Sequence, residues 1–212
     1  MNLHKDGNIW LPHKDPMNYL RDCVTVSGVP CYQRHQVNAA VAKCGEKLHT
    51  VVDGGAYIGL LALQFSWRFK RVVCFEPIKE NFECLQRNTG HVPTIERHHA
   101  ALANTDGELV LTQSRGQKSF SWTALGESAH TETAHCHRLD TFKFENVNLI
   151  KLDVEGYELE ALRGAVETIE RCKPVVLIED KHVEGRPACA FLTSLGMTMV
   201  WNKSYDWLFV WK

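Results

Sequence analysis

From Leu48 onward, the chain alternates between short apolar runs and longer segments in which apolar side chains recur at helical spacing. The apolar runs predict strands at residues 49–53, 71–77, 147–154 and 173–180, with another inside 94–102. The segments between them predict helices at residues 57–68, 79–88, 158–169 and 187–196. Strands that alternate with helices in this way are typical of a parallel sheet covered by helices, so we expect an α/β fold.

The middle of the chain breaks this alternation. Residues 106–113 follow an Asp-Gly turn and predict a strand, and the stretch TAHCHRLDTF alternates as an edge strand does. Between them, residues 114–131 are polar and rich in Ser, Gly and Thr, which predicts a mobile loop.

The two ends of the chain lead to separate expectations. The runs MTMVWN and DWLFVW near the C-terminus predict an antiparallel pair of strands. Residues 1–45 lack a clear period, and we expect a helical or irregular segment packed on the core. A chain of 212 residues suits one hydrophobic core, so we predict a single domain over residues 46–212.

The charge balance argues against an extended nucleic-acid surface. Lys and Arg number 24 against 25 Asp and Glu, whereas proteins that bind phosphate backbones usually carry a basic excess. The stretch MNLHKDGNIWLPHKDP lacks the apolar core of a signal peptide, and no apolar run reaches membrane-spanning length. The eight cysteines include no C-x-x-C pair, as expected of free thiols in a reducing compartment. These features predict a cytoplasmic protein with no membrane partner.

The stretch VVDGGAYIG contains the first candidate ligand site. It leads from an apolar strand through Gly54, Gly55 and Gly59 into a helix, which brings backbone N–H groups to one point. The pattern is D-x-G-x-x-x-G and lacks the dinucleotide fingerprint G-x-G-x-x-G. The carboxylate of Asp53 would repel a pyrophosphate and attract an ammonium group, which favours S-adenosylmethionine over NAD. The alternative is a tight turn with no ligand.

Two further strand ends carry ionisable side chains. Glu76 ends the second strand, where its carboxyl oxygens can accept hydrogen bonds from ribose hydroxyls; the alternative is a solvated acid before Pro77. The apolar run LIKLDVEG carries Lys151, Asp153 and Glu155 to the same predicted edge. Such groups are costly when they are buried without partners. They therefore indicate either a strand-end site or an ion pair between Lys151 and one of the two acids.

Five stretches, in order over roughly residues 48–180, resemble the FkbM family of S-adenosylmethionine-dependent methyltransferases: VVDGGAYIG, CFEPIKENFECLQRN, HRLDTF, LIKLDVEGYELEALRGA and KPVVLIE. The most specific of these motifs is D-V-E-G-x-E. The resemblance implies a Rossmann-like class I methyltransferase fold, with a seven-stranded, mostly parallel sheet and helices on both faces. It also implies methyl transfer to a hydroxyl oxygen of a sugar or polyketide-like small molecule, and hence a small-molecule or glycan acceptor.

The resemblance further implies which residues contact the cofactor. The glycine loop would shape the methionine end, Glu76 would hold the ribose, Asn81 would support the loop, and the residues after the third strand would lie near the adenine. The full expected set is Asp53, Gly54, Gly55, Ala56, Tyr57, Gly59, Glu76, Pro77, Asn81, Ala100, Ala101 and Asp153. The family usually has Asn at the position of Tyr57, whose ring we expect to wall the cofactor pocket instead.

Methyl transfer to a hydroxyl requires an aligned acceptor and a route for its proton. Asp153, at the end of the fourth main-sheet strand, is the expected catalytic base. Lys151 or Glu155 would assist it, and His182 is a second candidate base.

A divalent metal that lowers the pKa of the hydroxyl is the other option. Asp153, Glu179 and Asp180 lie at the ends of neighbouring predicted strands, and their oxygens would suit Mg²⁺. The alternative, which we favour slightly, is that Glu179 caps its strand and Asp180 is solvated.

The leading hypothesis is therefore an S-adenosylmethionine-dependent O-methyltransferase, with three rivals. One rival is a nucleoside-cofactor-binding interaction module that has lost catalysis. Another is an RNA ribose 2′-O-methyltransferase, whose Lys-Asp-Lys-Glu set could be imitated by Lys151, Asp153, Lys181 and Glu184, but the near-zero net charge disfavours it. The third is an NAD-dependent oxidoreductase, which the missing dinucleotide fingerprint disfavours.

Overall fold

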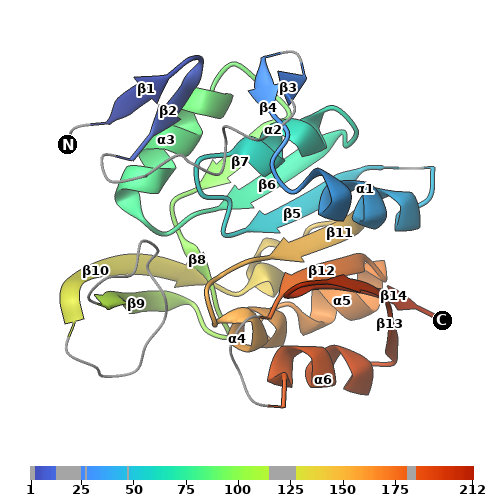
Figure 1. Cartoon of the computed structure of the whole chain (residues 1–212). Coiled ribbons are helices and arrows are strands. Elements are labelled where there is room, and N and C mark those ends of the chain that lie inside the picture. The colour runs from blue at the N-terminus through green and yellow to red at the C-terminus, as the bar shows by residue number, and fades with distance from the viewer. Residues whose placement is uncertain (1–2, 13–24, 27, 47, 115–127, 181–184) are drawn as a thin grey trace.

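The structure is a computed structural model that describes residues 3–12, 25–26, 28–46, 48–114, 128–180 and 185–212 (Figure 1). Its elements in chain order are β1 (His4–Asp6), β2 (Ile9–Leu11), β3 (Thr25–Val26), β4 (Val29–Pro30), α1 (Arg34–Lys43), β5 (Thr50–Gly54), α2 (Leu60–Ser66), β6 (Arg71–Phe75), α3 (Lys79–Thr89), β7 (Ile95–His98), β8 (Ala101–Leu102), β9 (Gly107–Ser114), β10 (Ser128–His137), the 3₁₀ helix η1 (Leu139–Phe142), β11 (Val147–Leu152), α4 (Glu158–Arg163), α5 (Val166–Cys172), β12 (Val175–Glu179), α6 (Pro187–Ser194), β13 (Met197–Lys203) and β14 (Asp206–Trp211).

The largest sheet has seven strands in the order β13-β14-β12-β11-β5-β6-β7. Strands β7, β6, β5, β11 and β12 pair in parallel, and β14 pairs antiparallel with both β12 and β13. The predicted seven-stranded, mostly parallel sheet is confirmed, as is the antiparallel pair at the C-terminus. The strand order reverses between β5 and β11, and ligands of open α/β sheets bind at such a switch point, beyond the carboxyl ends of the strands.

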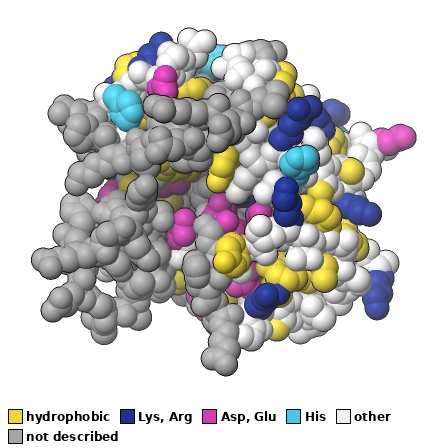
Figure 2. All heavy atoms as spheres, in the orientation of Figure 1, with side chains coloured by type: hydrophobic (Ala, Val, Ile, Leu, Met, Phe, Trp, Pro, Cys, Tyr) yellow, Lys and Arg dark blue, Asp and Glu magenta, His cyan; other side chains and the backbone are white. Residues whose placement is uncertain are grey.

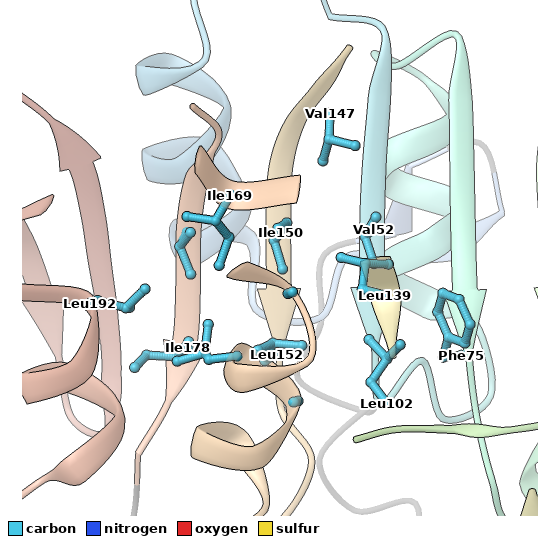
Figure 3. Close-up of a cluster of buried hydrophobic side chains, with 14 of the residues drawn as sticks. Val52, Phe75, Leu102, Leu139, Val147, Ile150, Leu152, Ile169, Ile178 and Leu192 are labelled. Atoms are coloured by element: carbon cyan, nitrogen blue, oxygen red, sulfur yellow. The ribbon is translucent and has the colours of Figure 1, made fainter. Parts of the chain in front are cut away.

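Different helices bury the two faces of this sheet. Along β5, Val51 joins a cluster with residues of α1, α2 and α3, while Val52 joins a cluster with residues of α4, α5 and α6. Figure 3 shows part of the second cluster, in which Leu139, Ile169 and Leu192 approach the side chains of the strands. Each fully buried aliphatic side chain contributes about 1.5–3 kcal/mol. The expectation of helices on both faces is confirmed.

The middle of the chain forms a separate three-stranded sheet in the order β8-β10-β9. It corrects two expectations. The stretch TAHCHRLDTF was expected to be an edge strand, but its residues 133–137 belong to β10, the central strand of this smaller sheet, and its residues 139–142 form η1. The predicted mobile loop at 114–131 is too long: Ser114 ends β9, and residues 128–131 belong to β10. Residues 115–127 lie outside the described part of the chain.

The N-terminal part contains more strand than was expected. Besides helix α1, residues 1–45 contribute two short antiparallel pairs, β1 with β2 and β3 with β4. Strands of two or three residues are too short for an alternating pattern to reveal them, which is why a helical or irregular segment was expected. In Figure 1 the β1–β2 pair lies against α3.

A glycine divides the predicted helix 158–169 into two. Helix α4 ends at Arg163 and α5 begins at Val166. Gly164 lies so close to the neighbouring loop that a Cβ placed there would be 1.9 Å from the carbonyl oxygen of Ala103. Asp140 then accepts the free N–H groups of Glu167 and Thr168 at the start of α5, at 3.1 and 2.8 Å.

Among the described residues, no helix combines the length and the apolar character needed to cross a membrane. The described cysteines, namely Cys31, Cys44, Cys74, Cys84, Cys136, Cys172 and Cys189, are all free thiols.

The close approach at Gly164 predicts that Gly164→Ala lowers stability, although Gly→Ala in a helix normally raises it. In a helical setting, Gly→Ala normally raises the free energy of unfolding by about 0.5–1 kcal/mol. Gly164→Ala is expected to lower it by about 1–3 kcal/mol, because the new methyl group must push the Ala103 carbonyl away. Urea unfolding measures this difference, and an equal or higher stability of the variant would contradict it.

Candidate functional site

The acidic residues predicted from the sequence meet at the carboxyl ends of three neighbouring strands. Asp53 lies at the end of β5, Glu76 follows β6, and Asp153 follows β11. These strands are parallel neighbours, so their ends open onto one edge of the sheet. Figure 2 shows several acidic side chains close together near the middle of the face that it displays. This edge is the candidate site.

A buried lysine links two of these strand ends. Residue Lys151 of β11 is in register with Asp53 of β5, and its Nζ lies 3.2 Å from Asp53 Oδ1. The same ammonium donates to the carbonyl oxygens of Gly54 and Gly55, at 3.4 and 3.0 Å. These two hydrogen bonds engage two of the three ammonium protons, and the contact with Asp53 is an ion pair. The Oδ2 atom of Asp153 lies further away, at 4.0 Å.

The Asp53–Lys151 pair corrects the interpretation of both residues. The sequence offered an ion pair of Lys151 with Asp153 or Glu155 as the alternative to a strand-end site; the pair with Asp153 is present at 4.0 Å, but Asp53 is the nearer partner. The sequence also suggested a carboxylate on Asp53 that is free to bind an ammonium group. Instead, Asp53 is 0% exposed and its charge is neutralised by Lys151. Neither Asp53 oxygen accepts a well-aligned hydrogen bond from the described residues, so the neutralisation comes from proximity. Contact of Asp53 with a methionine ammonium stays a prediction.

The two partners shift each other's protonation. Burial raises the pKa of Asp53, and the neighbouring Lys151 counteracts this by lowering it. Burial by itself would lower the pKa of Lys151, but the nearby carboxylates of Asp53 and Asp153 outweigh burial and raise it. Lys151 therefore stays cationic. A lysine that keeps its proton and has its donors engaged cannot act as a base, so Lys151 is a positioning residue.

The glycine loop between β5 and α2 uses its own N–H groups. Those of Gly55 and Ala56 both donate to the carbonyl oxygen of Phe75, at 3.0 Å each, and that of Gly59 donates to Ala56. The N–H of Tyr57 donates to Glu76 Oε2 at 2.8 Å. A loop that binds pyrophosphate needs such groups free for the anion. This loop is therefore not a phosphate cradle.

The glycines of the loop are required by packing inside the protein. A Cβ on Gly55 would lie 1.8 Å from the carbonyl oxygen of Asp153, and Gly55 has φ of +75°. A Cβ on Gly59 would lie 2.7 Å from side-chain atoms of Leu85 and Thr89 on α3. These contacts hold the glycine loop against the loop after β11 and against α3. Gly55 and Gly59 therefore have a structural role in this turn, and their contact with a ligand stays a prediction.

The Glu76 carboxylate is buried and held by neighbouring donors. Its Oε1 accepts the N–H of Ile78 at 3.0 Å and the Asn81 side-chain amide at 3.2 Å. Its Oε2 accepts the N–H of Tyr57 and keeps room for another donor, because a carboxylate oxygen accepts about two. Burial raises the pKa of Glu76 from 4.5 to about 7, against the lowering effect of these hydrogen bonds. Asn81 thus holds Glu76, and its support of a cofactor loop stays a prediction.

Tyr57 adopts a left-handed backbone conformation that favours Asn, the residue usual in the family at this position. Its φ is +51°, in the left-handed region where Asn is enriched and where other side chains are strained by about 1–2 kcal/mol. The ring packs with Ile58, Leu60 and Cys84 and with apolar residues of the N-terminal part. This packing offsets the strain. The expectation that the ring walls a cofactor pocket stays a prediction.

The loop after β11 contains a residue that the sequence interpretation missed. Glu158 is buried at the start of α4, and its Oε1 accepts the N–H groups of Val154 and Gly156, at 3.1 and 3.2 Å. Burial raises its pKa to about 7. The final Glu of the D-V-E-G-x-E motif was the available signal. Glu158 shapes the loop that presents Asp153 and Glu155, both of which remain partly exposed.

The metal prediction does not gain support. Asp180 is buried after β12, which corrects the expectation that it is solvated, and its N–H donates to the carbonyl of Tyr205. Glu179 is half-buried at the strand end. Across the described ranges, no three His, Cys, Asp or Glu side chains form a group that could hold a metal ion. His182, the second candidate base, lies in residues 181–184, outside the described part.

The remaining predicted cofactor residues lie around the same edge. Pro77 follows Glu76 directly and is half-buried. Ala100 follows β7 in the core, and Ala101 belongs to β8, where it pairs with Cys136 of β10. The β9–β10 pair is fixed beside this edge, since Glu132 accepts the N–H of Lys79 at 2.8 Å.

Sequence comparison links this chain to one family. Residues 53–199 match the model of the methyltransferase FkbM domain. A curated protein named Methyltransferase 1 from Beauveria bassiana (strain ARSEF 2860) is 28% identical over 142 residues, which is 54% of this chain and 57% of that protein. The chain therefore spans little more than half the length of this relative.

Solved structures share the fold. A methyltransferase FkbM from Methylobacillus flagellatus KT aligns with a TM-score of 0.56 and 21% identity, over 78% of this chain and 44% of that one. A precorrin 8w decarboxylase from Methanobacterium thermoautotrophicum aligns with a TM-score of 0.54 and 13% identity, over 85% of this chain and 81% of that one. A precorrin-6y C5,15-methyltransferase from Geobacter metallireducens GS-15 aligns with a TM-score of 0.52 and 10% identity, over 91% of this chain and 95% of that one.

The buried pair predicts that removing one partner lowers stability strongly and that removing the second partner as well restores most of it. Lys151→Met is expected to lower the free energy of unfolding by about 3–5 kcal/mol, because the Asp53 charge would be left buried without compensation. Adding Asp53→Val should recover most of this loss, since two apolar side chains replace the pair. Urea unfolding measures both variants.

The matched control removes an ion pair from the surface. Arg163→Met breaks the contact of a half-exposed arginine with Glu160, and it should cost about 0–1 kcal/mol. If Lys151→Met costs no more than this control, the account of the buried pair is wrong.

The raised pKa of Glu76 predicts a pH dependence of stability. The folded pKa of about 7 exceeds the ordinary 4.5, so the folded protein binds the proton more tightly than the unfolded chain. The resulting stabilisation is fully present below pH 4.5 and is lost as the pH rises through about 7, by roughly 1–3 kcal/mol. Glu76→Gln should therefore lose less stability than wild type between about pH 5 and about pH 8. Glu108→Gln, at an exposed strand position, is the control; identical slopes in all three proteins would contradict the prediction.

Proposed function

Because the chain belongs to the FkbM methyltransferase family, we propose that it binds S-adenosylmethionine at the carboxyl edge of its main sheet and methylates a hydroxyl oxygen of a small molecule or glycan. Family membership supports the cofactor. The choice of oxygen as acceptor and the class of substrate are what the family resemblance implies, and Asp153 at the edge is a base that suits a hydroxyl. The free cysteines and the absence of basic excess agree with our proposal of a cytoplasmic small-molecule reaction.

The residues at the edge fit this cofactor better than a dinucleotide. Glu76 Oε2 can accept a further hydrogen bond, as a ribose hydroxyl would supply. In the glycine loop, the N–H groups of Gly55, Ala56, Tyr57 and Gly59 all donate to acceptors inside the protein. These four N–H groups are therefore not available to bind a pyrophosphate. The partly exposed carboxylates of Asp153 and Glu155 would also repel phosphates and favour the cationic methionine end.

The observation that carries the proposed reaction is the position of Asp153. It lies just beyond β11, with its carbonyl oxygen against Gly55 of the glycine loop. Its side chain is 22% exposed, whereas that of Asp53 is 0% exposed. Of these two carboxylates, Asp153 is therefore the one that an acceptor can reach.

The proposed chemistry assigns each residue a separate part. Bound S-adenosylmethionine would supply an electrophilic methyl group and release a neutral thioether, so the acceptor hydroxyl must lose its proton as the new C–O bond forms. Asp153 would orient that hydroxyl and take the proton. The ammonium of Lys151, 4.0 Å from Asp153 Oδ2, would attract this carboxylate and hold it in position.

The ribose 2′-O-methylation of RNA has less support. Its Lys-Asp-Lys-Glu set needs a lysine that faces the acceptor, but Lys151 is 3% exposed and donates to Gly54 and Gly55. Lys181 and Glu184 lie outside the described residues. An inactive binding module would keep Glu76 and the glycine loop and would show no dependence on Asp153.

A methyl-transfer screen tests the proposal. The full chain is incubated with labelled S-adenosylmethionine and panels of glycans, hydroxylated small molecules, nucleosides and amines, with and without EDTA. We expect label on a hydroxyl acceptor, retained in EDTA because the described acids do not form a metal-binding group. Asp153→Asn should lower kcat about 10²–10⁴-fold, the usual share of a general base.

Glu155→Gln is the matched control, because it removes a neighbouring, partly exposed carboxylate of the same loop. It should retain most of the kcat if Asp153 is the base. Label on amines alone would refute the O-methyl assignment. Full activity of Asp153→Asn would refute the role of this residue.

A further inference from the structure

The β1–β2 pair, which we call the N-terminal hairpin (residues 4–11), lies outside the residues that match the family model. It nevertheless packs against α3, the helix that follows Glu76 in sequence (Figure 1). Leu11 is 0% exposed, so the hairpin is part of the folded core and not a loose extension. Its packing raises the question of what it does for the adjacent site.

One buried side chain connects the hairpin to the glycine loop. Asn88 of α3 accepts the N–H of Trp10 at 2.7 Å and donates to the Trp10 carbonyl at 2.9 Å. The same amide nitrogen donates to the carbonyl of Ile58 at 2.8 Å. Asn88 is 4% exposed, and both of its amide protons and its oxygen are engaged. The amide therefore pairs with β2 as a neighbouring strand would, and it holds the loop with its remaining proton.

Further contacts fix the hairpin at this position. The Trp10 ring lies under two cations, with the Arg87 guanidinium at 4.4 Å and the Lys5 ammonium at 5.9 Å from its centre. Ile9 and Leu11 of the hairpin form one buried cluster with Ile58 of the loop. Ile58 is thus connected to the hairpin in two ways, through the side-chain amide of Asn88 and through apolar contacts.

The residues on either side of Ile58 connect the hairpin to Glu76, the carboxylate that we propose binds the ribose. Tyr57 precedes Ile58, packs in the same cluster and donates its N–H to Glu76 Oε2. Gly59 follows Ile58 and packs on α3, one turn from Asn88. The path from hairpin to site runs through Trp10, Asn88, Ile58 and Tyr57 to Glu76.

We propose that Asn88 is a positioning residue through which the N-terminal hairpin sets the orientation of the Tyr57 N–H and Glu76, so that cofactor affinity depends on the docked hairpin. The ligand in this statement rests on the proposed function; the coupling between hairpin and loop does not. The competing explanation is that Asn88 only holds the hairpin to α3, with no effect beyond Trp10.

Amide hydrogen exchange on the full chain without ligand separates the two explanations. In Asn88→Ala the Trp10 amide loses its acceptor, so it should exchange faster under either explanation. The Tyr57 amide should also exchange roughly five- to tenfold faster if the loop is coupled, as expected for the loss of one hydrogen bond. Unchanged protection at Tyr57 would overturn the proposal.

Asp140→Ala is the matched control, because it removes two buried hydrogen bonds at α5, on the opposite face of the sheet. It should lower global stability and leave the relative protection of Tyr57 and Trp10 unchanged. If Asn88→Ala does not fold, Asn88→Ser retains a hydroxyl donor and carries the same expectation with a smaller change.

Calorimetry with S-adenosylmethionine adds the functional readout. The Kd of Asn88→Ala should rise roughly five- to tenfold while that of Asp140→Ala is unchanged, and kcat at saturating cofactor should fall little in either variant. By linkage, cofactor binding to wild type should slow exchange of the Trp10 amide. Wild type that fails to bind the cofactor would refute the proposed function, whereas an unchanged Kd in Asn88→Ala would refute this proposal alone.

Discussion

A single lysine ammonium enclosed between two strand ends is the interaction on which the candidate site depends. Lys151 neutralises Asp53, holds the carbonyl oxygens of Gly54 and Gly55 and approaches Asp153. Without this cation, a carboxylate at the centre of an apolar sheet would lack compensation, and the carbonyl groups of the turn would lose their donor. The pair thereby fixes where the glycine loop leaves β5, and all of the other contacts at the edge follow from that position.

The demands of internal packing and of ligand binding meet in the same loop. Gly55 has no side chain because the Asp153 carbonyl occupies that space, and Gly59 has none because α3 is in contact with it. The N–H groups of the loop are likewise bound to Phe75, Ala56 and Glu76. What the loop offers a ligand is therefore its shape and its acidic neighbours rather than a row of free donors. This distinction separates a nucleoside carrying a cationic tail from one carrying a pyrophosphate.

Much of this arrangement could be predicted from the sequence, because strand ends follow from where apolar runs stop. That reasoning located Asp53, Glu76 and Asp153 on one edge, and the family resemblance implied the seven-stranded, mostly parallel sheet. It could not supply the cross-strand register, which places Lys151 of β11 nearer to Asp53 of β5, at 3.2 Å, than to Asp153 next to it in sequence, at 4.0 Å. It also missed Glu158 and the N-terminal hairpin, since a buried carboxylate that binds loop amides and strands of three residues leave no periodic signal.

The central claim is that this edge of the sheet accepts S-adenosylmethionine and excludes a dinucleotide. Parallel calorimetric titrations of the full chain with S-adenosylmethionine and with NAD test it most directly, because the two ligands share an adenosine and differ in a cationic tail against a pyrophosphate. The account predicts saturable binding of S-adenosylmethionine and no measurable heat of binding with NAD. Saturable binding of NAD without binding of S-adenosylmethionine would contradict it.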